Sequence, residues 1–248
     1  MKVSIITVVY NNESTISGAI ESVLSQQDID LEYIIIDGAS TDNTVRIIKS
    51  FRSDINIFIS EKDGGIYDAM NKGISASSGD IIGILNSDDL YADSQVINDV
   101  LKQFRNDSKL DILYGNLDYV KFKNVNKVIR KWISKSYYPS FFEDGNVPPH
   151  PTVFVKRYVY FTMGMFDLSY KLAADYEFMI RALKLHKVKS QHINRLMIKM
   201  RLGGATNKSF HNIFNANLEI LQAWRKNGWQ IPLKLIPLRI IKRISQYF

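Results

Sequence analysis

The chain contains no cysteine among its 248 residues, and this absence removes several kinds of chemistry at once. Disulfides, zinc–thiolate sites and thiol nucleophiles all require that residue, and a chain without it suits a reducing cytoplasm. No apolar run approaches the roughly 20 residues that cross a bilayer. The first residues, Met1 to Ile6, enter a strand pattern and lack the layout of a signal peptide. We therefore expect a cytoplasmic protein without a membrane-spanning helix.

Acidic residues are outnumbered, with 25 Asp and Glu against 32 Lys and Arg, and the formal net charge is +7. Such a surplus points to an anionic partner, either nucleic acid or a membrane surface, and composition alone does not choose between them. The basic residues are clustered. One cluster runs from Lys121 to Lys135 without an acidic residue, and the other follows Pro232 and comprises Lys234, Arg239, Lys242 and Arg243.

Strand and helix patterns alternate along the first hundred residues. Apolar runs predict strands at 3–9, 33–36, 55–60 and 80–85, and helical spacing predicts helices at 14–26, 44–51 and 66–75. Such alternation is typical of a mostly parallel sheet flanked by helices, the α/β class. Further on we expect a helix at 95–104, a strand at 111–114, loops and extended segments over 116–150, and helices at 176–185 and 213–224. The simplest division is one domain over residues 1–225 and a basic amphipathic tail over residues 226–248.

The most informative stretch is Asn86-Ser87-Asp88-Asp89, which directly follows the apolar run at 81–85. Two carboxylates at the end of a buried strand are costly unless something positive meets them. Oxygen ligands without cysteine favour Mg²⁺ or Mn²⁺ over zinc. The stretch therefore predicts a divalent cation that holds a phosphorylated substrate, with a turn or a helix cap as the alternative.

Three further carboxylates occur at similar places. Asp37 closes the second strand, Asp63 follows the third strand beside two glycines, and Asp175 precedes a helical pattern. The carboxyl ends of parallel strands are where α/β folds bind ligands, so Asp37, Asp63 and Asp88 are expected along one edge of the sheet. Turn chemistry for Asp37 and a helix cap for Asp175 remain alternatives.

These residues together resemble the family 2 glycosyltransferases, which have the GT-A fold. The resemblance extends from residue 3 to about 185 and rests on five segments in order and at the right spacing. They are Val3-Ser4-Ile5-Ile6-Thr7-Val8-Val9-Tyr10-Asn11, Ile36-Asp37-Gly38-Ala39-Ser40-Thr41-Asp42, Glu61-Lys62-Asp63-Gly64-Gly65-Ile66-Tyr67-Asp68-Ala69-Met70-Asn71-Lys72-Gly73, Asn86-Ser87-Asp88-Asp89 and Ala173-Ala174-Asp175-Tyr176-Glu177. The nearest likeness is to bacterial enzymes that build O-antigen, capsule or exopolysaccharide.

The resemblance implies a role for each matching position. Asp88 falls on the metal position of the family's Asp-X-Asp motif, and Asp175 on the general base of an inverting enzyme. The first Asp of that motif is Asn86 here, which removes a charge from the metal site. The nucleotide-sugar pocket is expected to contain Thr7, Tyr10, Asp37, Asp63, Asn86, Ser87 and Arg201, and the Mn²⁺ or Mg²⁺ site Asp88, Asp89 and His150.

Three of these assignments have a second interpretation. Tyr10 is either a stacking platform for the base or part of the core. His150, between two prolines, is either a structural residue or a metal ligand or acceptor contact. The segment from Arg201 to Gly204 either folds over the donor diphosphate or makes an ordinary turn.

The implied reaction moves a sugar from a nucleotide donor, expected to be UDP-linked, to a lipid-diphosphate-linked glycan. A nucleotidyltransferase is one alternative, but it usually has a Gly-rich loop with a basic residue where Tyr10-Asn11-Asn12-Glu13 stands. A non-catalytic module that binds glycan or nucleic acid is the other, and it gives no reason for Asp37, Asp88 and Asp175 at their positions. We expect no nucleic-acid partner.

The tail combines Leu238, Ile241, Ile244 and Phe248 with basic residues at helical spacing. A cationic amphipathic helix of this kind lies on anionic membranes, although a terminal helix packed on its own domain is the alternative. Because the expected acceptor is a lipid, we predict peripheral, salt-sensitive attachment to the inner face of the plasma membrane, with the Lys121–Lys135 cluster as a second contact.

Overall fold

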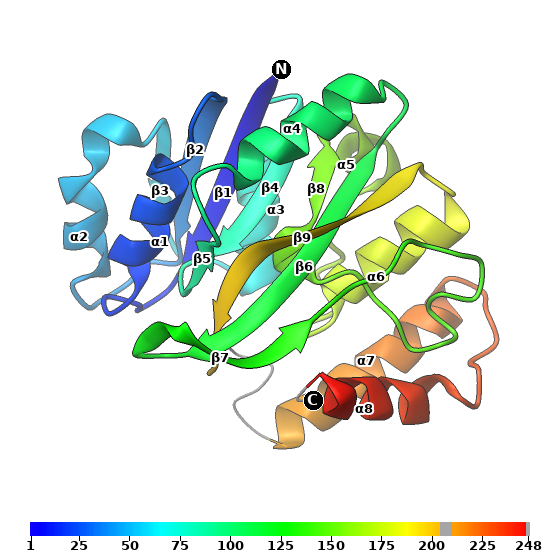
Figure 1. Ribbon diagram of the computed structural model, residues 1–248. Helices are drawn as coiled ribbons and strands as arrows, with labels where there is room; N and C mark the ends of the chain where they lie inside the picture. The colour runs from blue at the N-terminus through cyan, green and yellow to red at the C-terminus, as the bar shows by residue number, and fades with distance from the viewer. Residues whose placement is uncertain (204–209, 247–248) are drawn as a thin grey trace.

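The computed structural model describes residues 1–203 and 210–246 (Figure 1). Gly204 and Phe248, which belong to two of the segments discussed above, lie outside that range. The strands are β1 (Lys2–Val9), β2 (Asp30–Asp37), β3 (Ile57–Ser60), β4 (Ile81–Asn86), β5 (Asp89–Tyr91), β6 (Ile112–Lys121), β7 (Asn124–Trp132), β8 (Phe154–Lys156) and β9 (Ser190–Arg201). The helices are α1 (Ile16–Leu24), α2 (Thr44–Ser50), α3 (Ile66–Ala76), α4 (Val96–Asn106), α5 (Arg157–Met163), α6 (Ala174–Ile180), α7 (Phe210–Lys226) and α8 (Leu235–Ser245).

All the strands of the described chain join one sheet in the order β3-β2-β1-β4-β8-β6-β9-β5, with β7 paired to β6. β1, β2, β3 and β4 are parallel to one another. The short β8 is antiparallel to both β4 and β6, so β6 and its parallel neighbour β9 run in the same direction as the first four strands. The prediction of a mostly parallel sheet flanked by helices is therefore confirmed.

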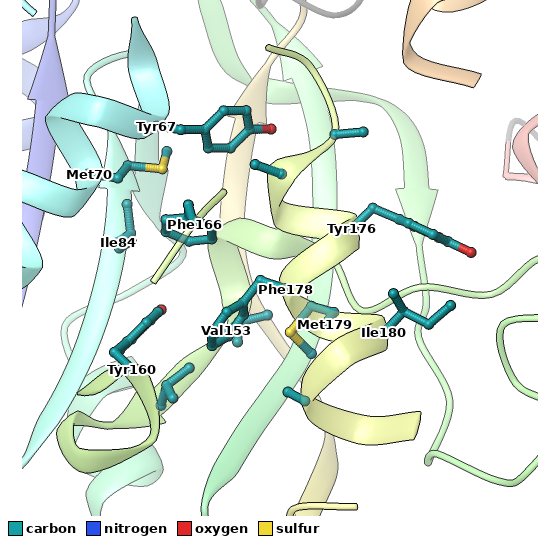
Figure 2. Close-up of a cluster of buried hydrophobic side chains, with 14 of the residues drawn as sticks. Tyr67, Met70, Ile84, Val153, Tyr160, Phe166, Tyr176, Phe178, Met179 and Ile180 are labelled. Atoms are coloured by element: carbon teal, nitrogen blue, oxygen red, sulfur yellow. The ribbon is translucent and has the colours of Figure 1, made fainter. Parts of the chain in front are cut away.

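Alternation of side chains along β1 divides the core into two layers. Ile6 and Val8 pack with residues of α3 and α6 on one face, while Ile5 and Val9 pack with residues of α1 and α4 on the other. Apolar side chains thus cover both faces, as expected for parallel strands linked by helical crossovers. Figure 2 shows the first layer between α3 and α6, with Phe166 and Phe178 at its centre.

The second half of the sheet departs from the sequence expectations. The region expected as extended segments and loops contains the hairpin of β6 and β7. The strand expected at 111–114 continues as β6 well past Tyr114 although it carries polar residues. One of these, Asn116, is buried and accepts hydrogen bonds from the backbone N–H of Ser134 (3.0 Å) and donates one to Asn194 (2.9 Å). The hydrogen bonds of such buried polar residues are made with partners that are distant in the sequence. Hydrophobic periodicity therefore does not predict the strand that contains them.

The C-terminal helices pack against the domain. Leu235, at the start of α8, is fully buried in the same cluster as Trp224 of α7. Within the described residues, no helix combines the length and the apolar composition that a bilayer crossing requires.

Candidate active site

Four of the predicted site residues lie at one edge of the sheet because they end parallel strands or directly follow them. Asp37 ends β2, Asn86 ends β4 and Arg201 ends β9, while Tyr10 follows β1. The register places Asp37 opposite Val9 and Asn86 opposite Val8, so these ends are level. The topology therefore builds a polar rim where α/β folds bind ligands.

Asp37 is fully buried and holds the turn behind it. Its carboxylate accepts hydrogen bonds from the hydroxyls of Ser40 (2.5 Å) and Ser60 (2.6 Å) and from the backbone N–H of Ser40. These bonds join the ends of β2 and β3 and match the turn chemistry considered above. The predicted contact of Asp37 with ribose stays a prediction.

Tyr10 and Asp63 meet over Gly38. A Cβ atom at Gly38 would lie 2.6 Å from Oδ2 of Asp63 and 3.4 Å from Cδ2 of Tyr10, so any larger residue there would displace the Asp63 carboxylate. Tyr10 is 64% exposed, which rules out the core-packing alternative and leaves its ring free for a ligand. Asp63 accepts a hydrogen bond from the backbone N–H of Gly65 at 2.9 Å.

Thr7 points away from this rim. Its side chain shares the face of β1 that carries Ile5 and Val9, is fully buried, and lies in hydrogen-bond contact with the hydroxyl of Tyr33 at 3.1 Å. The expectation of Thr7 in the nucleotide pocket therefore does not hold for its side chain, because the alternation of the strand directs it into the core.

The Asn86–Asp89 stretch is a turn with buried oxygen atoms. Asn86 donates from its amide to Asp89 Oδ2 (3.0 Å), and burial together with Asp88 raises the pKa of the Asp89 carboxyl well above its usual range. Among the described residues, Asn86 Oδ1 and Asp89 Oδ1 are buried and accept no hydrogen bond. Unpaired buried oxygens fit an oxygen-binding cation. Ser87 faces the other way, because its hydroxyl accepts from Asn12 at 2.8 Å.

Arg201 reaches the same turn from the end of β9. Its guanidinium donates to the backbone oxygen of Asp88 at 2.7 Å and to that of Phe122 at 3.2 Å. Burial lowers its pKa, while the charges of Asp88 and Asp89 oppose that shift. Arg201 therefore positions the carboxylate pair and places a cation beside it.

Asp175 stands in the first turn of α6 and is held by Tyr67, the second residue of α3. The Tyr67 hydroxyl donates to Asp175 Oδ1 at 2.9 Å, and burial together with this carboxylate raises the pKa of Tyr67 well above its usual range. Figure 2 shows the Tyr67 ring reaching from α3 toward the first turn of α6. Sequence reasoning missed this role of Tyr67, because its partner is 108 residues away.

His150 lies beside Asp175, and its ring meets Phe166 edge-on at 5.5 Å. Burial lowers the pKa of its imidazole, and the charge of Asp175 opposes that shift. Across the described chain, no three His, Asp or Glu side chains form a group that could hold a metal. The expected set of Asp88, Asp89 and His150 is therefore not assembled within the described residues, where the adjacent carboxylates Asp88 and Asp89 remain the candidate ligands.

Comparisons with known proteins agree with this arrangement. The family model described as glycosyl transferase family 2 matches residues 4–168. An uncharacterized glycosyltransferase of Mycobacterium tuberculosis is 31% identical over 183 residues, covering 73% of this chain and 68% of that protein. S. aureus TarS 1-349, solved in complex with UDP-GlcNAc, has a TM-score of 0.65 at 17% identity, covering 98% of this chain and 79% of that one.

A second solved structure is glucosyl-3-phosphoglycerate synthase from Mycobacterium tuberculosis in complex with Mn²⁺, UDP and phosphoglyceric acid. Its TM-score is 0.66 at 15% identity, and the match covers 92% of this chain and 79% of that one. Structures this distant in sequence establish the fold, which is GT-A, and the family match establishes the class of enzyme. The chain is a glycosyltransferase and belongs to glycosyl transferase family 2.

Proposed function

We propose that the enzyme moves a sugar from a UDP-linked donor, with inversion, onto a glycan carried by a lipid diphosphate in bacterial surface polysaccharide synthesis. The M. tuberculosis synthase was solved with UDP and S. aureus TarS with UDP-GlcNAc, which supports a nucleotide-sugar donor. The exposed ring of Tyr10 beside Asp63 suits a nucleoside, since base–aromatic stacking needs an accessible ring.

The observation that carries the proposal is the Tyr67–Asp175 pair close to the rim. A sugar hydroxyl is a poor nucleophile, so a carboxylate must take its proton as the new bond forms. Asp175 accepts that proton while the hydroxyl attacks the anomeric carbon opposite the leaving diphosphate. Tyr67 orients the carboxylate through its 2.9 Å hydrogen bond. One such displacement inverts the anomeric centre, and an α-linked donor gives a β-linked product.

Asp88 and Asp89 would hold a divalent cation, and Mn²⁺ in the M. tuberculosis synthase supports that expectation. A bound cation neutralises charge on the leaving nucleoside diphosphate. Mg²⁺ and related ions are often bound by one or two carboxylates together with substrate phosphates, which agrees with an aspartate pair and no third ligand in the described chain.

The test is turnover of a panel of nucleotide sugars, with Mn²⁺, with Mg²⁺ and with EDTA, using a GlcNAc-diphosphate-lipid analogue as acceptor. We expect one donor to be used, and Asp175→Asn to lower kcat by about 10²–10⁴-fold with unchanged donor binding. If no donor turns over and the protein instead binds glycan without metal, the proposed reaction is wrong.

We also propose that the protein attaches peripherally to the inner face of the plasma membrane, through a surface that differs from the expected one. The β6–β7 hairpin exposes Lys121, Lys123, Lys127 and Lys131, whereas α8 exposes isoleucines at 51–59% and half-buries its cations. The exposed large apolar side chains of α7, of α8 and of the described segment between them are Phe214, Leu218, Leu233, Ile240, Ile241 and Ile244.

Apolar side chains of this kind enter the boundary between headgroups and acyl chains. We therefore expect flotation with anionic liposomes that partly resists salt and is lost in Ile240→Asp/Ile244→Asp. Lys123→Gln/Lys127→Gln, on the hairpin, should remove only the salt-sensitive part. If wild-type protein does not float with anionic liposomes at low salt, the proposed membrane attachment is wrong.

A further inference from the structure

Helix α8 turns its cations toward the protein. Arg239, Lys242 and Arg243 are half-buried, whereas Ile240, Ile241 and Ile244 are exposed by 51%, 59% and 56%. A helix that uses its cations to bind an anionic membrane would have the opposite orientation. Figure 1 shows α8 below the sheet, on the side where the parallel strands end. Helix α8 therefore lies at the end of the molecule where the rim is.

Arg239 lies next to the proposed base. Its guanidinium sits over the ring of Tyr176, 5.0 Å from the centroid, and Tyr176 directly follows Asp175. Burial lowers the pKa of Arg239, and the neighbouring Tyr176 and Asp175 oppose that shift. Arg243, one turn further along α8, adds to the lowering, so two guanidinium groups share this face.

Arg239 makes no ion pair or hydrogen bond with the described residues, although the charge of Asp175 acts on it. Other half-buried cations do make ion pairs, for example Arg181 with Glu177 at 2.9 Å. For Arg239, the described residues provide the ring of Tyr176 but neither a hydrogen bond nor an ion pair. A guanidinium has five N–H donors, and a partly desolvated cation without a partner is unfavourable. The guanidinium of Arg239 is therefore available to an anionic ligand.

The loop before His150 fixes α8 in this position. A Cβ atom at Gly145, whose φ is +76°, would lie 2.8 Å from the backbone nitrogen of Arg239, so any other residue there would push the helix away. Lys234 pairs with Asp144 at 2.6 Å, and Lys242 donates to Asn146 Oδ1 at 2.5 Å. These contacts use Lys234 and Lys242 and leave the Arg239 guanidinium for another partner.

We propose that Arg239 binds the diphosphate of the lipid-linked acceptor, with Arg243 contributing charge from the next turn. The planar guanidinium matches a diphosphate through two parallel hydrogen bonds. The donor diphosphate is expected at Asp88, whereas Arg239 lies beside Asp175, where the acceptor hydroxyl must be. The lipid chain would leave past Ile240, Ile241 and Ile244. This inference rests on the proposed function and adds that a single sugar separates the diphosphate from the reacting hydroxyl.

The experiment compares wild type with Arg239→Gln, Arg239→Lys and the control Arg225→Gln, which removes an exposed arginine of α7. Acceptors are the GlcNAc-diphosphate-lipid analogue and an alkyl GlcNAc without phosphate. For Arg239→Gln we expect the KM of the diphosphate acceptor to rise at least tenfold, with kcat and donor KM within twofold. The acceptor KM of Arg239→Lys should lie between those of wild type and Arg239→Gln. Lysine keeps the positive charge but lacks the planar guanidinium that donates two parallel hydrogen bonds. Arg225→Gln should match wild type.

The phosphate-free acceptor separates recognition from structure. It should react equally poorly with wild type and Arg239→Gln, and an equal loss on both acceptors would show that Arg239 only supports the fold. A rise in donor KM in place of acceptor KM would assign the arginine to the donor diphosphate and overturn the proposal.

A binding measurement does not depend on turnover. Isothermal titration with farnesyl diphosphate should give affinity that falls at least tenfold in Arg239→Gln, while UDP affinity stays the same. Wild type that does not bind farnesyl diphosphate would contradict the acceptor site. If farnesyl diphosphate binds in an Arg239-dependent way but no donor supports transfer, the proposed reaction is wrong and the diphosphate site stands.

Discussion

The rim formed by β1, β2 and β4 and the wall formed by α6 and α8 hold their charged residues in different ways. On the rim, Asp37 accepts three hydrogen bonds and Ser87 is bonded to Asn12. On the wall, Asp175 accepts a hydrogen bond from Tyr67, and the guanidinium of Arg239 lies over the ring of Tyr176. The rim therefore holds most of its polar side chains by internal hydrogen bonds and leaves oxygen atoms of Asn86 and Asp89 unpaired, whereas the wall, where we propose that the acceptor binds, presents a guanidinium.

The largest effect that tests this comparison is expected on the rim. Asp88→Ala should lower kcat by about 10²–10³-fold, because the cation that neutralises the charge of the leaving diphosphate would lose a ligand. The protein should unfold at the wild-type temperature. Asp30→Ala, at the opposite end of β2, serves as the control and should be fully active. If Asp88→Ala is fully active, Asp88 does not take part in the reaction.

The second effect concerns stability and lies at the other edge of the same strands. Burial tends to raise the pKa of the Glu32 carboxyl, but hydrogen bonds from Lys2, Ser4 and Ser78 outweigh it and lower that pKa to about 2. Because the folded pKa is below the ordinary 4.5, the stabilisation is complete above about pH 4.5 and is lost as the pH falls toward 2.

Glu32→Gln should therefore lower the free energy of unfolding by about 2–3 kcal/mol at pH 7, with a difference that shrinks below pH 4. Urea unfolding at several pH values measures this. The exposed Glu21→Gln should change stability by less than about 0.5 kcal/mol. A loss for Glu32→Gln that is the same at pH 3 and pH 7 would show that charge is not the cause.

A smaller effect is expected for the nucleotide platform. Tyr10→Ala should raise the Kd of UDP about tenfold, in line with roughly 1–3 kcal/mol for a stacked base. Tyr10→Phe should keep wild-type affinity, because the ring face does the stacking. Thermal unfolding of both variants should match wild type, since Tyr10 is 64% exposed. Equal UDP binding by the Ala variant would place the base elsewhere.

The smallest effect links the two regions. Tyr67→Phe removes the hydroxyl that orients Asp175 and should lower kcat about fivefold, the equivalent of about 1 kcal/mol for one hydrogen bond. Tyr158→Phe is the matched control, because its hydroxyl also donates to an aspartate, Asp111, at 2.5 Å but outside the site. Similar kinetics for both variants would mean that Asp175 keeps its orientation without Tyr67.

Much of the nucleotide side was predictable from the sequence. The apolar runs and the polar residues that follow them are local signals, and the parallel sheet brings Asp37 and Asn86 to one edge, as expected. Thr7 shows the limit of such reasoning, because it lies in a matching segment but faces the core. A match identifies a strand, whereas alternation decides which face receives each side chain.

The family, the parallel β1–β4 core and the carboxylates at the strand ends follow from the sequence alone, since periodicity acts over a few residues. That Tyr67 holds Asp175, that β8 separates β4 from β6 and that α8 turns Arg239 inward follow from tertiary packing. These features depend on contacts between segments more than forty residues apart. Contacts of this kind do not change the hydrophobic periodicity of either segment. Each segment has the same local sequence pattern whether or not its distant partner is present.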